Sequence, residues 1–112
     1  MVHRKHRHPG RKIRCPLCWA RRKTHRYFED DLCWIADCEK CKVPMVVLKR
    51  HSMRITRAEH DSLTESLSRV ADSALGIDSY IIDRRQRKLK DHLHWHARRV
   101  RDAKKSVISS PD

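Results

Sequence analysis

The sequence predicts a single α+β domain, in which an antiparallel sheet packs against one long helix. Three observations predict this class: short segments that alternate apolar and polar residues, one long segment with helical periodicity, and a length of 112 residues that fits one domain. We place the domain at residues 15–99, between a basic arm at 1–14 and a polar tail at 100–112. Both ends are expected to be flexible.

Three strands are predicted before the helix. The segments RYFE (26–29) and LCWIAD (32–37) are separated by two aspartates, which indicates a hairpin. The third segment is KVPMVVLKRH (42–51), an apolar run with Pro44 near its start, where a missing backbone donor is tolerated. Alternation within the second segment places Cys33 on an apolar face, so we interpret it as a core residue.

The long helix is predicted between Thr56 and Gly76. Thr56 and Glu59 form a capping box, in which two side chains satisfy free backbone donors, and Gly76 ends the helix. Apolar residues follow the cap at spacings of four, three and four, which is one helical stripe: Leu63, Leu67, Val70 and Ala74. A short strand (78–83) and a basic connector (84–91) are predicted next.

The last strand is predicted in DHLHWHARR (91–99), where three histidines stand at every second position. Side chains alternate between the two faces of a strand, so His92, His94 and His96 share one face while Leu93 and Trp95 occupy the other. On a helix the same residues would spread over about 200°. The pattern therefore predicts a half-buried strand with a histidine-lined outer face.

Four of the five cysteines form two C-x2-C pairs that are separated by nineteen residues. This spacing is within the range of about 15–20 residues that is typical of four-cysteine zinc sites. Each pair lets two thiolates reach one ion, and two pairs complete a tetrahedron. An odd number of cysteines also favours metal binding over disulfides. We therefore predict a structural zinc ion (Zn2+) held by Cys15, Cys18, Cys38 and Cys41.

The chain is strongly basic, with 27 Lys and Arg against 14 Asp and Glu and a formal net charge of +13. Ten of the 27 lie within residues 1–26 and ten within 84–105. A field of this sign attracts polyanions, so nucleic acid is an expected partner of the basic ends. No stretch approaches the roughly 18 apolar residues that span a bilayer, and no secretory signal begins the sequence. We expect no membrane partner and a cytoplasmic location.

The histidines and the order of the segments together resemble the histidine triad family, whose motif is H-φ-H-φ-H-φ-φ with φ apolar. The likeness includes the early cysteine pair, the hairpin, the strand that ends in a Lys-x-His turn at His51, and the Thr56-capped helix. It covers roughly Cys15 to Arg98. The resemblance implies a HIT-like fold and a nucleotide hydrolase or nucleotidyl transferase that acts on a nucleotide or a nucleic-acid-end phosphate. A homodimer is the state of many relatives.

The resemblance also implies roles for individual residues. His94 matches the nucleophile that attacks the α-phosphorus, His92 the residue that supports it, and His96 one that contacts the phosphate. A neutral imidazole is a good nucleophile near pH 7. Before the triad the chain departs from the family, because DRRQRKLKD stands where relatives carry Asn, Gly and Gln. The candidate substrate-binding residues are one amide, a cationic rim and a histidine at the edge of the site: Gln86, Arg84, Arg87, Lys88 and His51.

Two alternatives stay open. Some branches of the family bind zinc through the early cysteine pair, the histidine after the third strand and the first triad histidine, which implies the ligands Cys15, Cys18, His51 and His92. Hairpin topology favours the four-cysteine set, because it places His51 about 20 Å away at the far end of the third strand. For function, the alternative to an enzyme is a catalytically silent, zinc-containing domain that binds nucleic acid.

Overall fold

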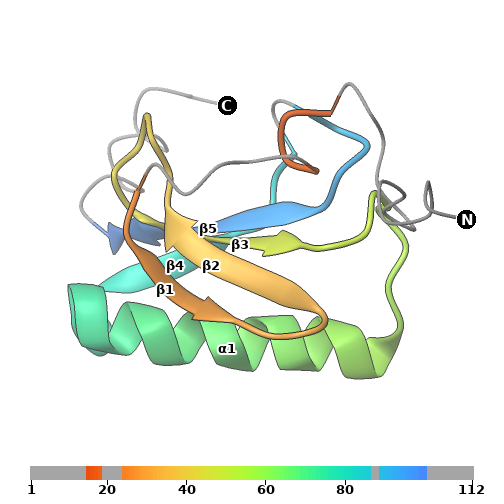
Figure 1. Ribbon diagram of the computed structural model, residues 1–112. Coiled ribbons are helices and arrows are strands. Elements are labelled where there is room, and N and C mark those ends of the chain that lie inside the picture. Colours follow the sequence, from red (N-terminus) through yellow and green to blue (C-terminus); the bar gives the residue numbers. More distant parts are fainter. Residues whose placement is uncertain (1–14, 19–23, 87–88, 101–112) are drawn as a thin grey trace, which may run out of the picture.

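The computed structural model describes residues 15–18, 24–86 and 89–100. Its elements are five strands and a helix: β1 (Arg26–Glu29), β2 (Cys33–Asp37), β3 (Pro44–Leu48), α1 (Arg57–Leu75), β4 (Tyr80–Asp83) and β5 (His94–Arg99). The strands form one antiparallel sheet in the order β1-β2-β3-β5-β4, and α1 lies across one face (Figure 1). The predicted α+β class with one long helix is confirmed. The predicted arm (1–14) and nearly all of the tail (101–112) lie outside the described residues.

The first hairpin forms where two aspartates interrupt the apolar pattern. The side chain of Asp30 accepts hydrogen bonds from the backbone N–H groups of Leu32 and Cys33, both at 2.9 Å. Aspartate favours turns for this reason, since its carboxylate replaces a backbone acceptor. The backbone N–H of Asp30 donates in turn to the carbonyl of Cys33 at 2.9 Å. The predicted pairing of β1 with β2 is therefore confirmed.

The helix begins and ends where the sequence predicts. The N–H of Glu59 donates to the Thr56 hydroxyl at 3.0 Å, and the N–H of Thr56 donates to the Glu59 carboxylate at 2.9 Å. A hydrogen bond from Arg50 to the same carboxylate lowers the pKa of Glu59 to about 2. At the other end Gly76 adopts φ +104°, and its N–H donates to the carbonyl of Ala71 at 3.2 Å. Both caps are set by local contacts.

The face of α1 that packs on the sheet differs in one residue from the predicted stripe. Leu63 and Leu67 are fully buried and Val70 is half-buried, as expected. Ala71 is also fully buried, whereas Ala74 is exposed, so the assignment of Ala74 to the stripe is wrong. Residues at i and i+4 lie on the same face of a helix, and the row 63, 67, 71 is the one that meets the sheet. No helix in the described ranges is both long and apolar enough to cross a membrane.

The core lies between α1 and the sheet. The sheet contributes buried side chains from β2, from β3, and from β5 with the residue before it: Cys33, Ile35, Val46, Leu48, Leu93, Trp95 and Ala97. Cys33 is 1% exposed and belongs to neither of the cysteine pairs, so its prediction as a core residue is confirmed. Leu93 and Trp95 are buried in this cluster as well. The apolar half of the predicted alternation therefore faces α1.

The three triad histidines lie on the opposite face of the sheet. β5 begins at His94, but the backbone just before it is still held by β3, because the N–H of Leu48 donates to the carbonyl of Leu93 at 3.1 Å. Alternation therefore continues back to His92. The face is not open, however: His92, His94 and His96 are only 0%, 6% and 9% exposed. Other segments of the chain cover the histidines, and those segments define the candidate site.

We predict that Leu67→Ala lowers the free energy of unfolding by about 2–5 kcal/mol, because it leaves a cavity where α1 meets the sheet. Urea denaturation followed by circular dichroism measures the loss. Ser73→Ala, at an exposed position of the same helix, is the control and should change stability by less than about 0.5 kcal/mol. Equal effects of the two substitutions would contradict the placement of α1.

Candidate functional site

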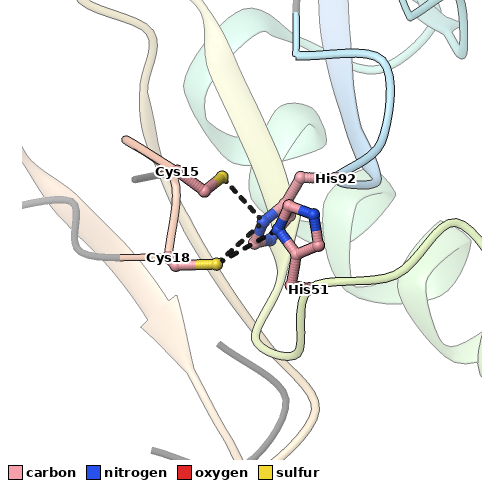
Figure 2. Close-up of side chains that lie close together, drawn as sticks. All are labelled: Cys15, Cys18, His51 and His92. Atoms are coloured by element: carbon pink, nitrogen blue, oxygen red, sulfur yellow. Dashed lines mark hydrogen bonds between the residues drawn. The ribbon is translucent and has the colours of Figure 1, made fainter. Parts of the chain in front are cut away.

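Four side chains bring one ligand atom each to a common point, as Figure 2 shows: Cys15, Cys18, His51 and His92. These atoms all lie within 4.8 Å of one another, and every residue of the group except His51 is buried. The Nδ1 atom of His92 is 3.3 Å from the sulfur of Cys15 and 3.4 Å from that of Cys18. The Nδ1 atom of His51 is 3.3 Å from the Cys18 sulfur. We call this set the first ligand group, and it is positioned to hold a metal ion.

The sheet topology brings the two histidines of this group together. His51 follows the end of β3, and His92 precedes the start of β5. Because β3 and β5 are antiparallel neighbours, the end of one lies beside the start of the other. The N–H of Leu93 donates to the carbonyl of Ser52 at 3.0 Å and ties the two loops. The turn at residues 15–18 lies above this end of the sheet, on the side away from α1 (Figure 1).

Hydrogen bonds on the far side of each ring direct both Nδ1 atoms toward the sulfurs. The Nε2 atom of His92 is 2.7 Å from the carbonyl oxygen of Leu48, which can only accept, so Nε2 carries the hydrogen and Nδ1 the lone pair. The Nε2 atom of His51 is 3.1 Å from the carboxylate of Asp91, so this Nε2 atom also carries the hydrogen and the Nδ1 atom of His51 carries the lone pair. Metal-binding histidines usually have such outer partners. Burial also lowers the pKa of His92, which favours the neutral ring that binds metal.

Cys38, Cys41 and His96 form a second ligand group, whose ligand atoms also lie within 4.8 Å of one another. The two cysteines are half-buried in the turn between β2 and β3, and His96 is buried. Met45, at the start of β3, is the strand partner of His96 on β5. The turn therefore lies over the third triad histidine, and this group too is positioned to hold a metal ion.

The four cysteines do not come together in the structure as the four-cysteine prediction requires. The first pair lies at the end of β3 and the second at its start, so the observed sets are Cys15, Cys18, His51 and His92, and Cys38, Cys41 and His96. The prediction placed Cys18 beside the start of β1. Seven residues separate Cys18 from Arg26, and at about 3.3–3.6 Å per residue they exceed the length of the five-residue strand β3. The chain can therefore reach the far end of the sheet.

His94 lies between the two ligand groups and belongs to neither. Its Nδ1 atom is 2.7 Å from the carbonyl oxygen of His92, so Nδ1 donates a hydrogen and the lone pair resides on Nε2. Within the described residues, that Nε2 atom has no hydrogen-bond partner. The rings of His94 and His96 stand edge to face with their centroids 5.9 Å apart. One imidazole with a defined lone pair, that of His94, thus lies between the two ligand groups.

Gln86 holds the strand on both sides of His94. Its Oε1 atom accepts from the backbone N–H of His94 at 3.0 Å, and its Nε2 group donates to the carbonyl of His92 at 2.9 Å. The Gln86 Nε2 atom is also 3.1 Å from the His94 Nδ1 atom. Since both nitrogens then carry hydrogens, this last approach is a packing contact. The amide of Gln86, predicted to bind substrate, is therefore engaged by the backbone of the triad.

The other predicted substrate-binding residues have different places. The guanidinium of Arg84 lies 4.6 Å from the ring centre of Trp95 and donates to the Thr64 hydroxyl of α1 at 2.9 Å. Trp95 faces the helix, so Arg84 does not lie on the histidine face as a substrate contact would require. His51 belongs to the first ligand group. Two further predicted residues lie outside the described part of the chain: Arg87 and Lys88.

Two residues that support the ligand groups were not predicted from the sequence. Asp91 holds the His51 ring and immediately precedes His92. Arg98 donates from Nη1 to the sulfur of Cys41 at 3.3 Å and from Nε to the carboxylate of Asp83 at 2.8 Å. Strand alternation could have identified Arg98, because Arg98 stands two residues after His96 and so lies on the same face of the strand.

No known protein-family model matches the sequence, and no characterised protein matches it either. The resemblance to the histidine triad family therefore rests on the motif and on the order of the segments. What the site does has to be inferred from its own residues.

We predict that Asp91→Asn weakens metal binding at the first ligand group by about 10- to 100-fold, because the amide is a poorer acceptor for the His51 N–H. Competition with a chromogenic chelator, with Zn2+ as the probe ion, measures the affinity. A Cys38→Ser background confines binding to the first group. The control, Asp31→Asn, changes an exposed carboxylate in the first hairpin and should have no effect. An unchanged affinity in Asp91→Asn would show that the carboxylate does not support the site.

Proposed function

We propose that the protein is a HIT-like phosphohydrolase or nucleotidyl transferase, with a nucleotide or a nucleic-acid-end phosphate as its substrate and His94 as its nucleophile. The orientation of the His94 ring carries the proposal. Its Nδ1 hydrogen is bound by the His92 carbonyl at 2.7 Å, which leaves the lone pair on Nε2. A nucleophilic imidazole needs this tautomer. Gln86 holds the carbonyl that accepts this hydrogen, and it also holds the His94 backbone.

The proposed reaction has two steps. The Nε2 atom of His94 attacks the α-phosphorus, an N–P bond forms, and the leaving group departs with the electron pair of its P–O bond, or of its P–N bond in a phosphoramidate. Water then attacks the phosphorus and loses a proton to the solvent, and the cleaved N–P bond returns its electron pair to Nε2. The ring carries positive charge between the two steps. The carbonyl dipole of His92 stabilises that charge through the Nδ1–H hydrogen bond.

The first ligand group fits a structural zinc ion. Zn–S distances of about 2.3 Å and Zn–N distances of about 2.0–2.1 Å place sulfur and nitrogen roughly 3.6 Å apart in a tetrahedron. The observed sulfur-to-nitrogen separations are 3.3–3.4 Å. Two thiolates and two imidazoles are ligands that zinc prefers, and four protein ligands close its coordination shell. The ion would fix His92, whose carbonyl in turn orients His94.

We predict that His94→Ala abolishes hydrolysis of a nucleoside phosphoramidate and the formation of a nucleotidyl adduct, with fold and metal content unchanged. Intact-protein mass spectrometry after brief incubation with nucleotides detects the adduct. His25→Ala, at an exposed histidine beside β1, is the control and should keep both activities. Wild-type turnover in His94→Ala, or a wild-type protein inactive on every phosphoester tried, would reject the enzyme proposal.

A second proposed function, binding of nucleic acid without catalysis, is favoured by the charge of the chain. The net charge is +13, and twenty of the 27 basic residues lie within 1–26 and 84–105. Neutralised phosphates release counterions, so such binding depends on salt. The same charge suits an enzyme that acts on nucleic-acid ends. Loss of turnover in His94→Ala with unchanged nucleic-acid affinity would assign catalysis and binding to different residues.

We predict that the protein binds nucleic acid and loses about 10³-fold in affinity between 50 and 200 mM salt. Deletion of residues 1–12 should weaken binding and flatten the slope of log K against log salt, because fewer counterions are released. Fluorescence anisotropy with a labelled oligonucleotide measures both quantities. Deletion of residues 109–112, which include no Lys or Arg, is the control. An affinity that does not respond to salt would count against this function.

A further inference from the structure

The two cysteines of the second ligand group have no part in the proposed reaction. Cys38, Cys41 and His96 nevertheless bring three metal-ligand atoms within 4.8 Å of one another. We propose that this group binds a second, zinc-type divalent ion, whose open coordination position accepts a phosphate oxygen. Binding of the ion does not depend on the proposed catalysis, whereas the role proposed for phosphate rests on that proposed function.

The turn that carries the two cysteines has a fixed conformation. The N–H of Cys38 donates to the carbonyl of Val43 at 2.8 Å, and the N–H of Lys42 donates to the carbonyl of Cys38 at 2.9 Å. Lys42 has φ +61°, a left-handed conformation that is unfavourable for any residue with a side chain. Unfavourable backbone geometry of this kind clusters at functional sites. The turn holds both sulfurs next to the His96 ring.

Arg98 supports one of the sulfurs from the side. Its Nη1 group donates to the sulfur of Cys41 at 3.3 Å, and its Nε group is anchored by Asp83 at 2.8 Å. Asp83 is the strand partner of His96, so the anchor and the imidazole are fixed by the same pair of strands. Arg98 is therefore an outer hydrogen-bond donor to one ligand atom of the second group, the kind of partner that orients metal ligands.

The number of ligands distinguishes this group from the first. The first group has four ligand residues, while among the described residues the second has three. A zinc-type ion with three protein ligands keeps its fourth position for water or for a substrate atom. His96 and His94 share one face of β5, and their ring centroids are 5.9 Å apart. A phosphate oxygen bound at the open position would therefore lie on the same face of the sheet as the His94 ring.

Counting ions tests the site directly. Native mass spectrometry of the full chain, loaded with Zn2+ and then desalted, should find two ions in the wild type. Cys38→Ser and Cys41→Ser should each bind one ion, because both remove a ligand from a half-exposed turn without disturbing the core. The matched control is Cys33→Ala, which removes a thiol outside both groups and should bind two. Circular dichroism confirms that each variant is folded.

Three results would overturn the site: one ion in the wild type, two ions in both serine variants, or a Cys38–Cys41 disulfide in protein purified with a reductant.

The open position has its own test with Co2+ as the probe. Two Co2+-loaded proteins are compared: the His94→Ala variant and the double variant that also carries Cys38→Ser. The difference between their absorption spectra is the spectrum of the second ion. Inorganic phosphate should change this difference spectrum, and an unchanged spectrum would reject the open position. Since His94→Ala is used, neither result depends on turnover.

Discussion

The alternation of β5 is the constraint on which the site depends. Leu93, Trp95 and Ala97 are buried in the core against α1, and this burial forces the intervening histidines to the opposite face. A shift of one residue in register would move the apolar side chains to the histidine face and the imidazoles into the core against α1. The free energy of core formation thus fixes the direction of all three rings. The site is positioned by the same contacts that hold the sheet on the helix.

The two ends of the histidine row meet two different cysteine pairs. His92 lies where β3 ends, beside the first pair, and His96 lies where β3 begins, beside the second. Each terminal histidine is thereby placed to share a metal ion with two sulfurs. Among His92, His94 and His96, only His94 belongs to neither ligand group, and its tautomer follows from the carbonyl of His92. The structure therefore places two of the three histidines in ligand groups and leaves the middle one outside both.

Local signals in the sequence predicted the fold well, and long-range signals predicted the site less well. The capping box of Thr56 and the aspartate turn at Asp30 depend on contacts within a few residues, so both could be read directly. Which cysteine pair meets which histidine depends on the path between Cys18 and β1, and spacing alone does not fix that path. The partners that set the ring tautomers could not be predicted either. The partner of His92 is the backbone carbonyl of Leu48, and every residue has such a carbonyl, so the sequence does not single it out.

The tautomers of the histidine rings test this account most directly. Long-range 1H–15N correlation spectra of the Zn2+-loaded, 15N-labelled protein distinguish Nδ1–H from Nε2–H rings and report metal coordination through the nitrogen shift. The account predicts that His51 and His92 are Nε2–H rings bound to metal through Nδ1, and that His94 is an Nδ1–H ring with no metal bond. An Nε2–H tautomer for His94, or a His92 ring whose shifts do not respond to removal of the metal, would contradict it.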